Sequence, residues 1–412
     1  EICPLLISGP CISVCYNRKT QGHDGEHRIH INNHPNAKAL CFSTWQERCG
    51  MRIAVGIDAH AKVCVARAVY VGRGDPNQKQ TKFLEDFNAA FGRMKTSREG
   101  LEPMARHLAG HDAHILIENS SVAHNVYWIL RNSGCDVTVA RSTDLYRITK
   151  SVKKNDENDA MELAMYMRRR MDGEREFAVC HMAPPEWMAR RAYLRAIFAD
   201  KSDLGDTKRR IHARLKVMGA ELPRDYDDIV CPSSLKQLRS TKDPFLCYQV
   251  SVATDALRRI REAERLIPAM YSDDRNYALL ITVPGIGPVM AAYLSSMIVD
   301  IGRFETKEDL ASYFGMVPKQ RSSADSDPAC GITRRGDGYA REYLGYAAMA
   351  HIQWAEGSVV AEMYHRLKAR GMPHKKVLAA CARKLTEVVW SVLVNGKPFT
   401  SDQTVLRMAR GT

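Results

Sequence analysis

Short apolar runs in the first part of the chain predict the strands of a β-sheet. Five runs of strand length alternate with turn-forming or helical stretches: 52–58, 61–72, 82–87, 113–118 and 135–140. The first run ends in Asp58 and the fourth ends in Glu118. Because the last side chain of a strand lies at the edge of its sheet, we expect both carboxylates at a sheet edge.

Helical patterns separate and follow these strands. Ser97 is the expected N-cap of a helix that continues to about Leu108, and apolar spacing predicts another helix over 121–132, ended by Gly134. A third helix opens within the segment KNDENDA. The resulting order, β-β-β-α-β-α-β-α, is that of the ribonuclease H-like fold. That fold carries carboxylates on its first strand, its fourth strand and its last helix.

Four acidic residues fit those places. Asp156 and Asp159 stand three apart in KNDENDA, so on a helix they share one face. Taken singly, each acid is more typical of a turn or of a first helical turn. If the elements converge, these two carboxylates meet those of Asp58 and Glu118. Crowded negative charge is costly unless divalent cations neutralise it, so the pattern predicts a Mg²⁺ (or Mn²⁺) site for phosphodiester chemistry.

Residues 186–271 carry a seven-residue apolar repeat that predicts a helical hairpin with coiled-coil seams. The first run contains Ile197, Leu204, Ile211 and Met218. The second run contains Leu246, Ala253, Ile260 and Ile267. Prolines, which break helices, separate the runs: Pro223, Pro232 and Pro244. Lys201 and Lys208 interrupt the first seam, which leaves loose or intermolecular pairing open, as well as two amphipathic helices packed on a neighbouring domain.

A different module begins near Tyr277. The segment VPGIGP leads into a helix over 289–298, and its Gly285 and Gly287 form the turn of a helix-hairpin-helix signature. Such a turn exposes backbone N–H groups at a helix N-terminus, which can hold a nucleic-acid phosphate without reading sequence. The alternative is a tight structural turn.

A loop rich in hydroxyl and basic side chains follows this module. Ser322 and Ser323 are flanked by basic residues that could hold a phosphate against a nucleophilic hydroxyl: Lys319, Arg321, Arg334 and Arg335. Read alone, both are ordinary loop serines. Helices are expected from about Tyr339 and over 374–394, the latter packed as core.

Composition favours an anionic polymer as partner. The chain has 412 residues, a formal net charge of +13 and a pI of about 9.2. Basic clusters recur along it: 168–170, 190–191, 208–210, 334–335 and 375–376. One cluster alone is typical of a solvated helix face, but several on a chain of this charge favour phosphate contact.

Cysteine spacing and the length of apolar stretches indicate in which cellular compartment the protein works. The 12 cysteines include no C-x-x-C pair, which argues against zinc and disulfides and for reduced, buried thiols. No apolar stretch reaches transmembrane length, so we expect a cytoplasmic protein that binds no membrane. Residues 1–50 show no sustained period and are interpreted as a poorly ordered extension before Met51.

The chain resembles the DEDD transposases of bacterial insertion sequences over about residues 51–399. The resemblance rests on GIDAHAK, LIENS, KNDENDA and VPGIGP, and on the block from ASYFGMVP through RSSAD to GITRRGDGYAREYL. It implies a RuvC-like catalytic domain with the ribonuclease H fold over 51–182. A coiled-coil hairpin would follow over 183–275, and a transposase domain over 276–412.

The resemblance also implies which residues act. The metal ligands would be Asp58, Glu118, Asp156 and Asp159. The catalytic serine lies five residues after Pro318, at Ser323. The next residue is Ala324 where the family has glycine, which keeps Ser322 as an alternative nucleophile.

The implied activity is recombination of donor and target DNA through a covalent phosphoserine. A structured RNA encoded by the element would guide the choice of sites. The protein would work as a homo-oligomer, from dimer to tetramer, in which the acidic cluster of one subunit meets the serine of another. It would be associated with the bacterial nucleoid.

Two rival functions remain open at this point. A junction resolvase would use the same acids with a metal-activated water and leave Ser323 without a function. A non-catalytic nucleic-acid-binding scaffold would not need Asp58 at all. The complete set of acidic motifs favours an enzyme over the scaffold.

Overall fold

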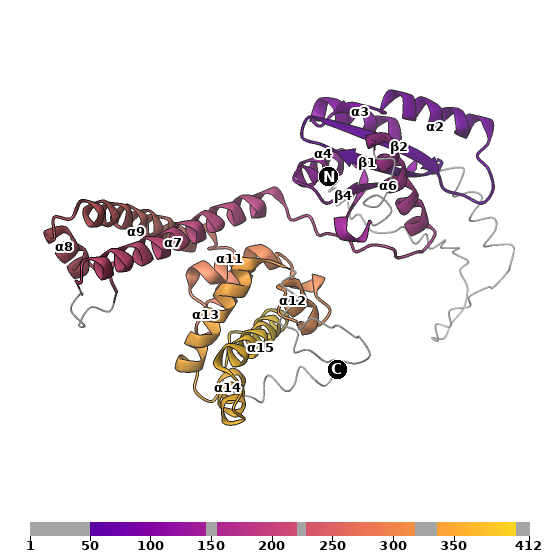
Figure 1. Ribbon diagram of the computed structural model, residues 1–412. Coiled ribbons are helices and arrows are strands. Elements are labelled where there is room, and N and C mark those ends of the chain that lie inside the picture. The colour runs from indigo at the N-terminus through magenta and orange to yellow at the C-terminus, as the bar shows by residue number, and fades with distance from the viewer. Residues whose placement is uncertain (1–49, 146–154, 221–227, 318–335, 401–412) are drawn as a thin grey trace, which may run out of the picture. The chain divides into compact units, whose positions relative to one another are not determined.

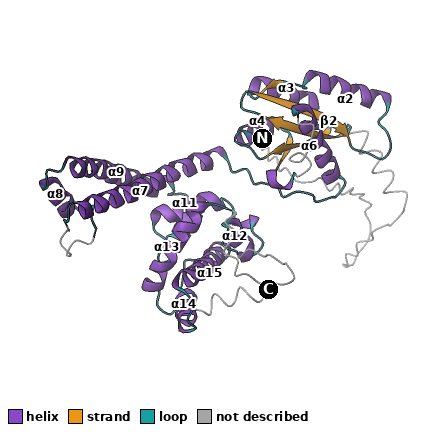
Figure 2. Cartoon of the chain, viewed as in Figure 1, coloured by secondary structure: helices purple, strands orange, loops and turns teal. Residues whose placement is uncertain are grey.

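The computed structural model describes most of the chain: residues 50–145, 155–220, 228–317 and 336–400. Contacts within it cluster into two units, Glu1–Met182 and Ala183–Thr412. Among the described residues, strands occur only in the first unit, and the second is helical (Figures 1 and 2). The extension predicted over 1–50 lies outside the described residues except for Gly50.

The first unit is built on a five-stranded sheet with the order β3-β2-β1-β4-β5. β1 (Arg52–Ala59) pairs antiparallel with β2 (Val63–Tyr70), and β2 pairs antiparallel with β3 (Met94–Lys95). On its other side β1 pairs parallel with β4 (Asp112–Glu118), which pairs parallel with β5 (Asp136–Ala140). This mixed α/β arrangement is compatible with the expected ribonuclease H-like fold.

Helices cover both faces of this sheet: α3 (Arg98–Leu108) and α4 (Ala123–Asn132) on one, and α6 (Asp156–Met171) on the other. Side chains alternate along a strand, which explains the division. Ile53 and its alternate neighbours on β1 join the core that contains α3 and α4. Ala54 on the opposite face packs with residues of α6.

Gly56 allows α6 to lie directly against β1. A Cβ at this position would overlap the backbone of Ala160 and Ala164 in α6. The absent side chain therefore sets the separation of helix and strand. Asp58 follows two residues later, so its side chain is on the same face of the sheet as α6.

The strand predicted over 82–87 is wrong, because this segment belongs to helix α2 (Gln78–Ala90). Asn77 caps the helix by accepting from the N–H of Gln80, while the Gln80 side chain accepts from the N–H of Asn77. Phe83 and Phe87 stand four residues apart on one helix face, and Phe87 is fully buried. The third strand is the two-residue β3 instead.

His114, near the start of β4, bridges two carboxylates. Its Nδ1 lies 2.8 Å from Asp136 Oδ2 and its Nε2 lies 3.0 Å from Asp112 Oδ1. The hydrogen bond to Asp136 is the main cause that raises the pKa of His114, and the same bond lowers the pKa of Asp136. Since only an imidazolium donates from both nitrogens, the pair favours the charged ring.

This bridge predicts a pH-dependent stability. A raised folded-state pKa means that the charged His114 stabilises the fold below about pH 6.5 and that this contribution disappears as pH rises through the folded-state pKa. We expect His114→Gln to lower the free energy of unfolding by about 1–3 kcal/mol at pH 5.5, and by less at pH 9. Thermal melts at both pH values measure the difference. Exposed His365→Gln is the control, and an equal loss at both pH values would contradict the prediction.

In the second unit, α7 (Pro185–Val217) packs along α9 (Pro244–Met270). The apolar repeat positions are buried between these two helices or against other helices, except Met218. The two lysines that interrupt the seam are ion-paired: Lys201 Nζ lies 2.8 Å from Glu264 and Lys208 Nζ lies 2.6 Å from Asp228. The hairpin helices thus pack within one chain, while supercoiled geometry and contacts between subunits stay predictions.

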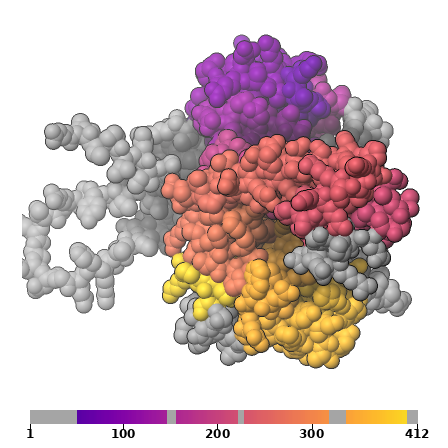
Figure 3. All heavy atoms as spheres, turned by 90° about the vertical axis from the view of Figure 1, so that its left-hand side faces the viewer, coloured from indigo at the N-terminus to yellow at the C-terminus, as the bar shows by residue number. Residues whose placement is uncertain are grey.

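The rest of this unit is a helical core. It contains α10 (Arg275–Leu280), α11 (Pro288–Ile298), α12 (Lys307–Tyr313), α13 (Gly338–Trp354), α14 (Val359–Ala369) and α15 (His374–Asn395). Residues of α7 and α9, such as Phe198 and Ile267, belong to the same buried cluster. In Figure 3 the orange surface near residue 300 adjoins the yellow C-terminal helices. The division at 275 stays a prediction, because contacts join 183–412 into one unit.

A short helix, α8 (Pro232–Ser240), packs on α9 and was not predicted. Pro232 and Pro244 each stand at the first position of a helix. A backbone N–H at this position has no partner within the helix, so proline, which has no N–H, costs no hydrogen bond there. They therefore begin helices as well as separating the two runs.

The cysteines of the described residues are free thiols. Cys64 and Cys381 are buried, and burial raises the pKa of each to about 11. The other described cysteines are only partly buried, so the expectation of buried thiols holds for these two alone. None of the helices in the described ranges is long and apolar enough to cross a membrane.

Candidate functional site

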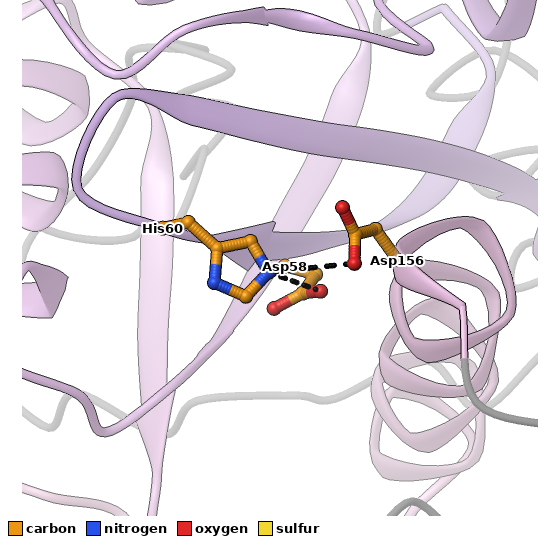
Figure 4. Close-up of side chains that lie close together, drawn as sticks. All are labelled: Asp58, His60 and Asp156. Carbon is orange, nitrogen blue, oxygen red and sulfur yellow. Dashed lines mark ion pairs between the residues drawn. The ribbon is translucent and has the colours of Figure 1, made fainter.

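Two of the predicted acids meet at one edge of the sheet. Asp58, near the end of β1, and Asp156, the first residue of α6, both contact the imidazole of His60 (Figure 4). His60 Nε2 lies 3.2 Å from Asp58 Oδ2 and 3.5 Å from Asp156 Oδ1. One ligand atom from each residue lies within 4.8 Å of the others, so the three together could hold a metal ion.

The other two acids lie close enough to affect Asp58. Glu118 ends β4, whose register with β1 places Ile57 beside Ile117 and thus the two acids at neighbouring strand ends. Burial raises the pKa of Asp58 above its usual value, and the charges of Asp156, Asp159 and Glu118 raise it further. The nearby His60 opposes this effect. The site therefore concentrates negative charge at a half-buried carboxyl.

The start of α6 is fixed by its own contacts. Asn155 caps the helix by accepting from the N–H of Asn158 at 2.7 Å. Arg67 of β2 pairs with Glu157 at 3.0 Å, which ties this first turn to the sheet. The helix N-terminus favours the negative charge of Asp156 and Asp159. Sequence, capping and close packing at Gly56 thus bring the second pair of acids to the first strand.

His60 is a site residue that the sequence pattern did not predict. The available signal was its place in GIDAHAK, two residues after Asp58 and just beyond the strand that ends in this candidate ligand. A lone histidine in a turn has no distinctive pattern by itself. The geometry adds it to the site.

The donor set fits a divalent cation. Carboxylate oxygens are the ligands that Mg²⁺ and Mn²⁺ take in proteins. Within the described residues, no Lys or Arg side chain forms an ion pair with Asp58 or Asp156, and both carboxylates contact His60 instead. A cation would therefore relieve the repulsion that raises the pKa of Asp58. Which ion it is does not follow from the carboxylates alone.

The Gly-Ile-Gly turn joins α10 to α11 and its two glycines differ in surroundings. Gly285 has φ +87°, and a Cβ there would overlap Ala347 O and lie 2.8 Å from His351 N in α13. Gly285 is therefore needed for packing. Gly287 is exposed at the N-cap of α11, with open space where a Cβ would be. Of the two, Gly287 has the geometry that suits a phosphate contact, which stays a prediction for both.

Buried His351 holds this turn in place. Its Nδ1 lies 2.7 Å from the Pro284 carbonyl oxygen, which can only accept, so Nδ1 carries the proton. Its Nε2 accepts from the Ser358 hydroxyl at 3.1 Å. Burial lowers the pKa of His351, which keeps the ring neutral and this arrangement of donors intact. The turn is thus fixed from α13 and α14.

Comparison with known proteins places this helical region in a family. Residues 277–365 match the family model described as Transposase IS116/IS110/IS902 family. The transposase for insertion sequence element IS1328 of Yersinia enterocolitica is 31% identical over 145 residues, which are 34% of this chain and 43% of that protein. These matches make part of the chain similar to the transposases of insertion sequences.

Other proteins match over similar lengths. A probable family 20 transposase of Pseudomonas aeruginosa is 30% identical over 138 residues, 33% of this chain and 40% of the relative. The pilin gene-inverting protein of Moraxella lacunata is 28% identical over 123 residues, 30% of this chain and 38% of the relative. The matched regions thus span about two-fifths of the length of each of these curated relatives.

Part of the region that matches the transposase family lies outside the described residues. This applies to Ser323, Ser322 and the basic residues predicted around them: Lys319, Arg321, Arg334 and Arg335. The described chain resumes at Gly336, which approaches the backbone of Tyr313 and Gly315 so closely that a Cβ would not fit. Asp337 then caps α13 and pairs with Arg195 at 2.9 Å. The predicted functions of the serines and bases stay predictions.

Residues of several basic clusters form contacts within the protein. Arg169 pairs with Glu176 at 2.8 Å, and Arg191 donates to the carbonyl oxygen of Ser296 at 2.7 Å. Lys208 pairs with Asp228. These three side chains are engaged within the protein, so they contribute less to a phosphate-binding surface than the sequence suggested.

Proposed function

We propose that the chain is the transposase of an insertion sequence, which cleaves and joins DNA strands at the cluster formed by Asp58, Glu118, Asp156 and Asp159. The convergence of Asp58 and Asp156 at the edge of the mixed sheet carries this proposal. The match of residues 277–365 to the transposase family model supports it, as do the names of relatives that are transposases. Donor and target DNA would be the substrates.

The acids would hold one or more divalent cations, Mg²⁺ or Mn²⁺. A bound cation would act as a Lewis acid that stabilises negative charge on the scissile phosphate. The protein's contribution is positioning: β1 supplies Asp58, β4 supplies Glu118, and α6 supplies the other two acids. Partial burial of Asp58 lowers the local dielectric and strengthens each charge interaction at the cluster.

Ser323 is the proposed nucleophile, on the strength of the resemblance. Its hydroxyl would lose a proton as Oγ bonds to phosphorus, and the deoxyribose oxygen would leave with a proton. Attack by the hydroxyl end of a second strand would then release the serine and join the strands without ATP. Arg334 and Arg335, with Lys319 and Arg321, would neutralise phosphate charge.

The remaining partners also follow from the resemblance. A structured RNA encoded by the element would select donor and target sites. The turn of Gly285 and Gly287 would contact the nucleic-acid backbone. A homo-oligomer, from dimer to tetramer, would bring the acidic cluster of one subunit to the serine of another.

Metal removal tests the proposed function. The full chain, purified from bacteria that carry the entire element, should retain an RNA that maps beside its own gene. With that RNA it should join donor and target strands in Mg²⁺, and EDTA should lower the rate by at least about 10³-fold. Excess Mg²⁺ should restore it. Joining that persists in EDTA would contradict a metal-dependent carboxylate site.

A further inference from the structure

The backbone of His60 is held by two hydrogen bonds next to the acidic cluster at the sheet edge. Its backbone N–H donates to the Val63 carbonyl oxygen at 3.0 Å. Its carbonyl oxygen accepts from the Thr96 hydroxyl at 2.7 Å. These two bonds fix the residue on both sides although its side chain is 57% exposed. The turn therefore fixes the backbone from which the imidazole reaches Asp58 and Asp156.

The distances around this imidazole are those of ligands around one ion. Two ligand atoms that are each about 2.1 Å from an ion are about 3.0 Å apart at 90° and about 3.4 Å apart at the tetrahedral angle. His60 Nε2 is 3.2 Å from Asp58 Oδ2 and 3.5 Å from Asp156 Oδ1. The nitrogen thus lies about as far from each oxygen as two ligand atoms of one small cation lie from each other, and all three atoms are within 4.8 Å of one another.

We propose that His60 is a nitrogen ligand of the metal site and that it makes the site prefer Mn²⁺ over Mg²⁺. This inference rests on the proposed function and goes beyond it, because the four acids alone do not distinguish the two ions. Mg²⁺ strongly prefers oxygen ligands, whereas imidazole suits transition metals. A mixed set of carboxylates and one imidazole therefore shifts the preference toward the transition-metal ion that also accepts carboxylates.

The rival explanation is that His60 serves only as a counter-charge. A positive imidazole would stabilise the crowded acids when no ion is bound and would be displaced when one binds. On that account, removal of His60 would strengthen metal binding or leave it unchanged. A ligand predicts the opposite sign, so metal affinity separates the two explanations without any measurement of DNA joining.

The experiment loads the full chain with Mn²⁺ and detects the ligand nitrogen directly. Pulsed electron paramagnetic resonance should show coupling of Mn²⁺ to a ¹⁴N nucleus in the wild type, and His60→Ala should lose it. Isothermal titration should show that His60→Ala weakens Mn²⁺ binding by about tenfold and Mg²⁺ binding by less than about threefold. His365→Ala, in the other unit, should change neither.

A second variant guards against an indirect effect. His60→Gln keeps a polar side chain but offers an amide oxygen in place of the ring nitrogen. This variant should bind Mn²⁺ without nitrogen coupling, and its affinity for Mn²⁺ should exceed its affinity for Mg²⁺ by less than in the wild type. Thermal melts check that both variants fold. Metal binding without nitrogen coupling in the wild type would overturn the assignment of His60 and leave the carboxylate site standing. Absence of any metal binding would overturn both this inference and the metal site of the proposed function.

Discussion

Asp58→Asn is expected to abolish strand cleavage and joining while leaving the protein at least as stable as the wild type. The substitution removes one carboxylate oxygen from the site where Asp58 and Asp156 converge on His60. Loss of a metal ligand removes stabilisation of charge in the transition state, so we expect the rate to fall by at least about 10³-fold. Joining of labelled donor and target strands measures the rate.

The stability should respond in the opposite direction. The folded-state pKa of Asp58 is raised, so without a cation the folded protein binds the proton more tightly than the unfolded chain does. Wild-type stability therefore rises as pH falls through that folded-state pKa, and at neutral pH the ionised Asp58 destabilises the fold. Asparagine is neutral at every pH. Metal-free Asp58→Asn should accordingly melt at the same or a slightly higher temperature.

Asp112→Asn is the matched control at the opposite end of the sheet. Asp112 begins β4 and pairs with His114 and Arg52, far along the strands from the acidic cluster. Its substitution should lower stability and leave joining within about twofold of wild type. If Asp58→Asn joins strands at the wild-type rate, Asp58 is not required for the chemistry and the proposed active site is wrong.

Ser323→Ala is expected to prevent the formation of a covalent protein–DNA adduct. Alanine has no oxygen to bond to phosphorus, so neither the adduct nor the joined product should form. The substrate is a nicked DNA on which cleavage releases a short strand, so that the reverse reaction is lost and the adduct accumulates. Denaturing gels of labelled DNA with protein then show the adduct as a shifted band in the wild type.

Ser322→Ala is the control for this prediction. It alters the neighbouring hydroxyl and should leave the adduct in place. If Ser322→Ala loses the adduct and Ser323→Ala keeps it, the nucleophile is Ser322. If wild-type protein cleaves the DNA with no adduct at all, water is the nucleophile, and the chain acts as a junction resolvase.

The acids of the site were predictable because their signals are local. Asp58 and Glu118 end apolar runs, and the register of two parallel strands brings such ends together. Asp156 and Asp159 open a helix whose cap, Asn155, is also legible in sequence. Each step uses only neighbours along the chain, and the order of strands then limits where the ends can meet.

His60 and α2 escaped prediction for different physical reasons. His60 is joined to the cluster by backbone bonds to Val63 and Thr96, and the bond to Thr96 spans residues distant in sequence. In α2 the pattern of apolar residues over 82–87 is short enough to fit either a strand or a helix. The capping box of Asn77 and Gln80 decides for the helix. The same two residues are legible in the sequence.

The hairpin helices show a further limit of periodicity. The seven-residue repeat correctly located α7 and α9, yet it does not state what each apolar residue contacts. Leu204 and Ile260 pack in the hairpin, whereas Ile197 and Ile267 belong to the core shared with the C-terminal helices. One continuous repeat thus serves two different cores, and only the tertiary structure separates them.

Gly56 shows how a residue that binds nothing can govern chemistry. Its hydrogen atom occupies the place where any other side chain would wedge α6 away from β1. A methyl group at that point would leave both elements intact and yet move Asp156 outward from Asp58. A single added carbon atom at this position would therefore change the distance between two carboxylates without touching either of them.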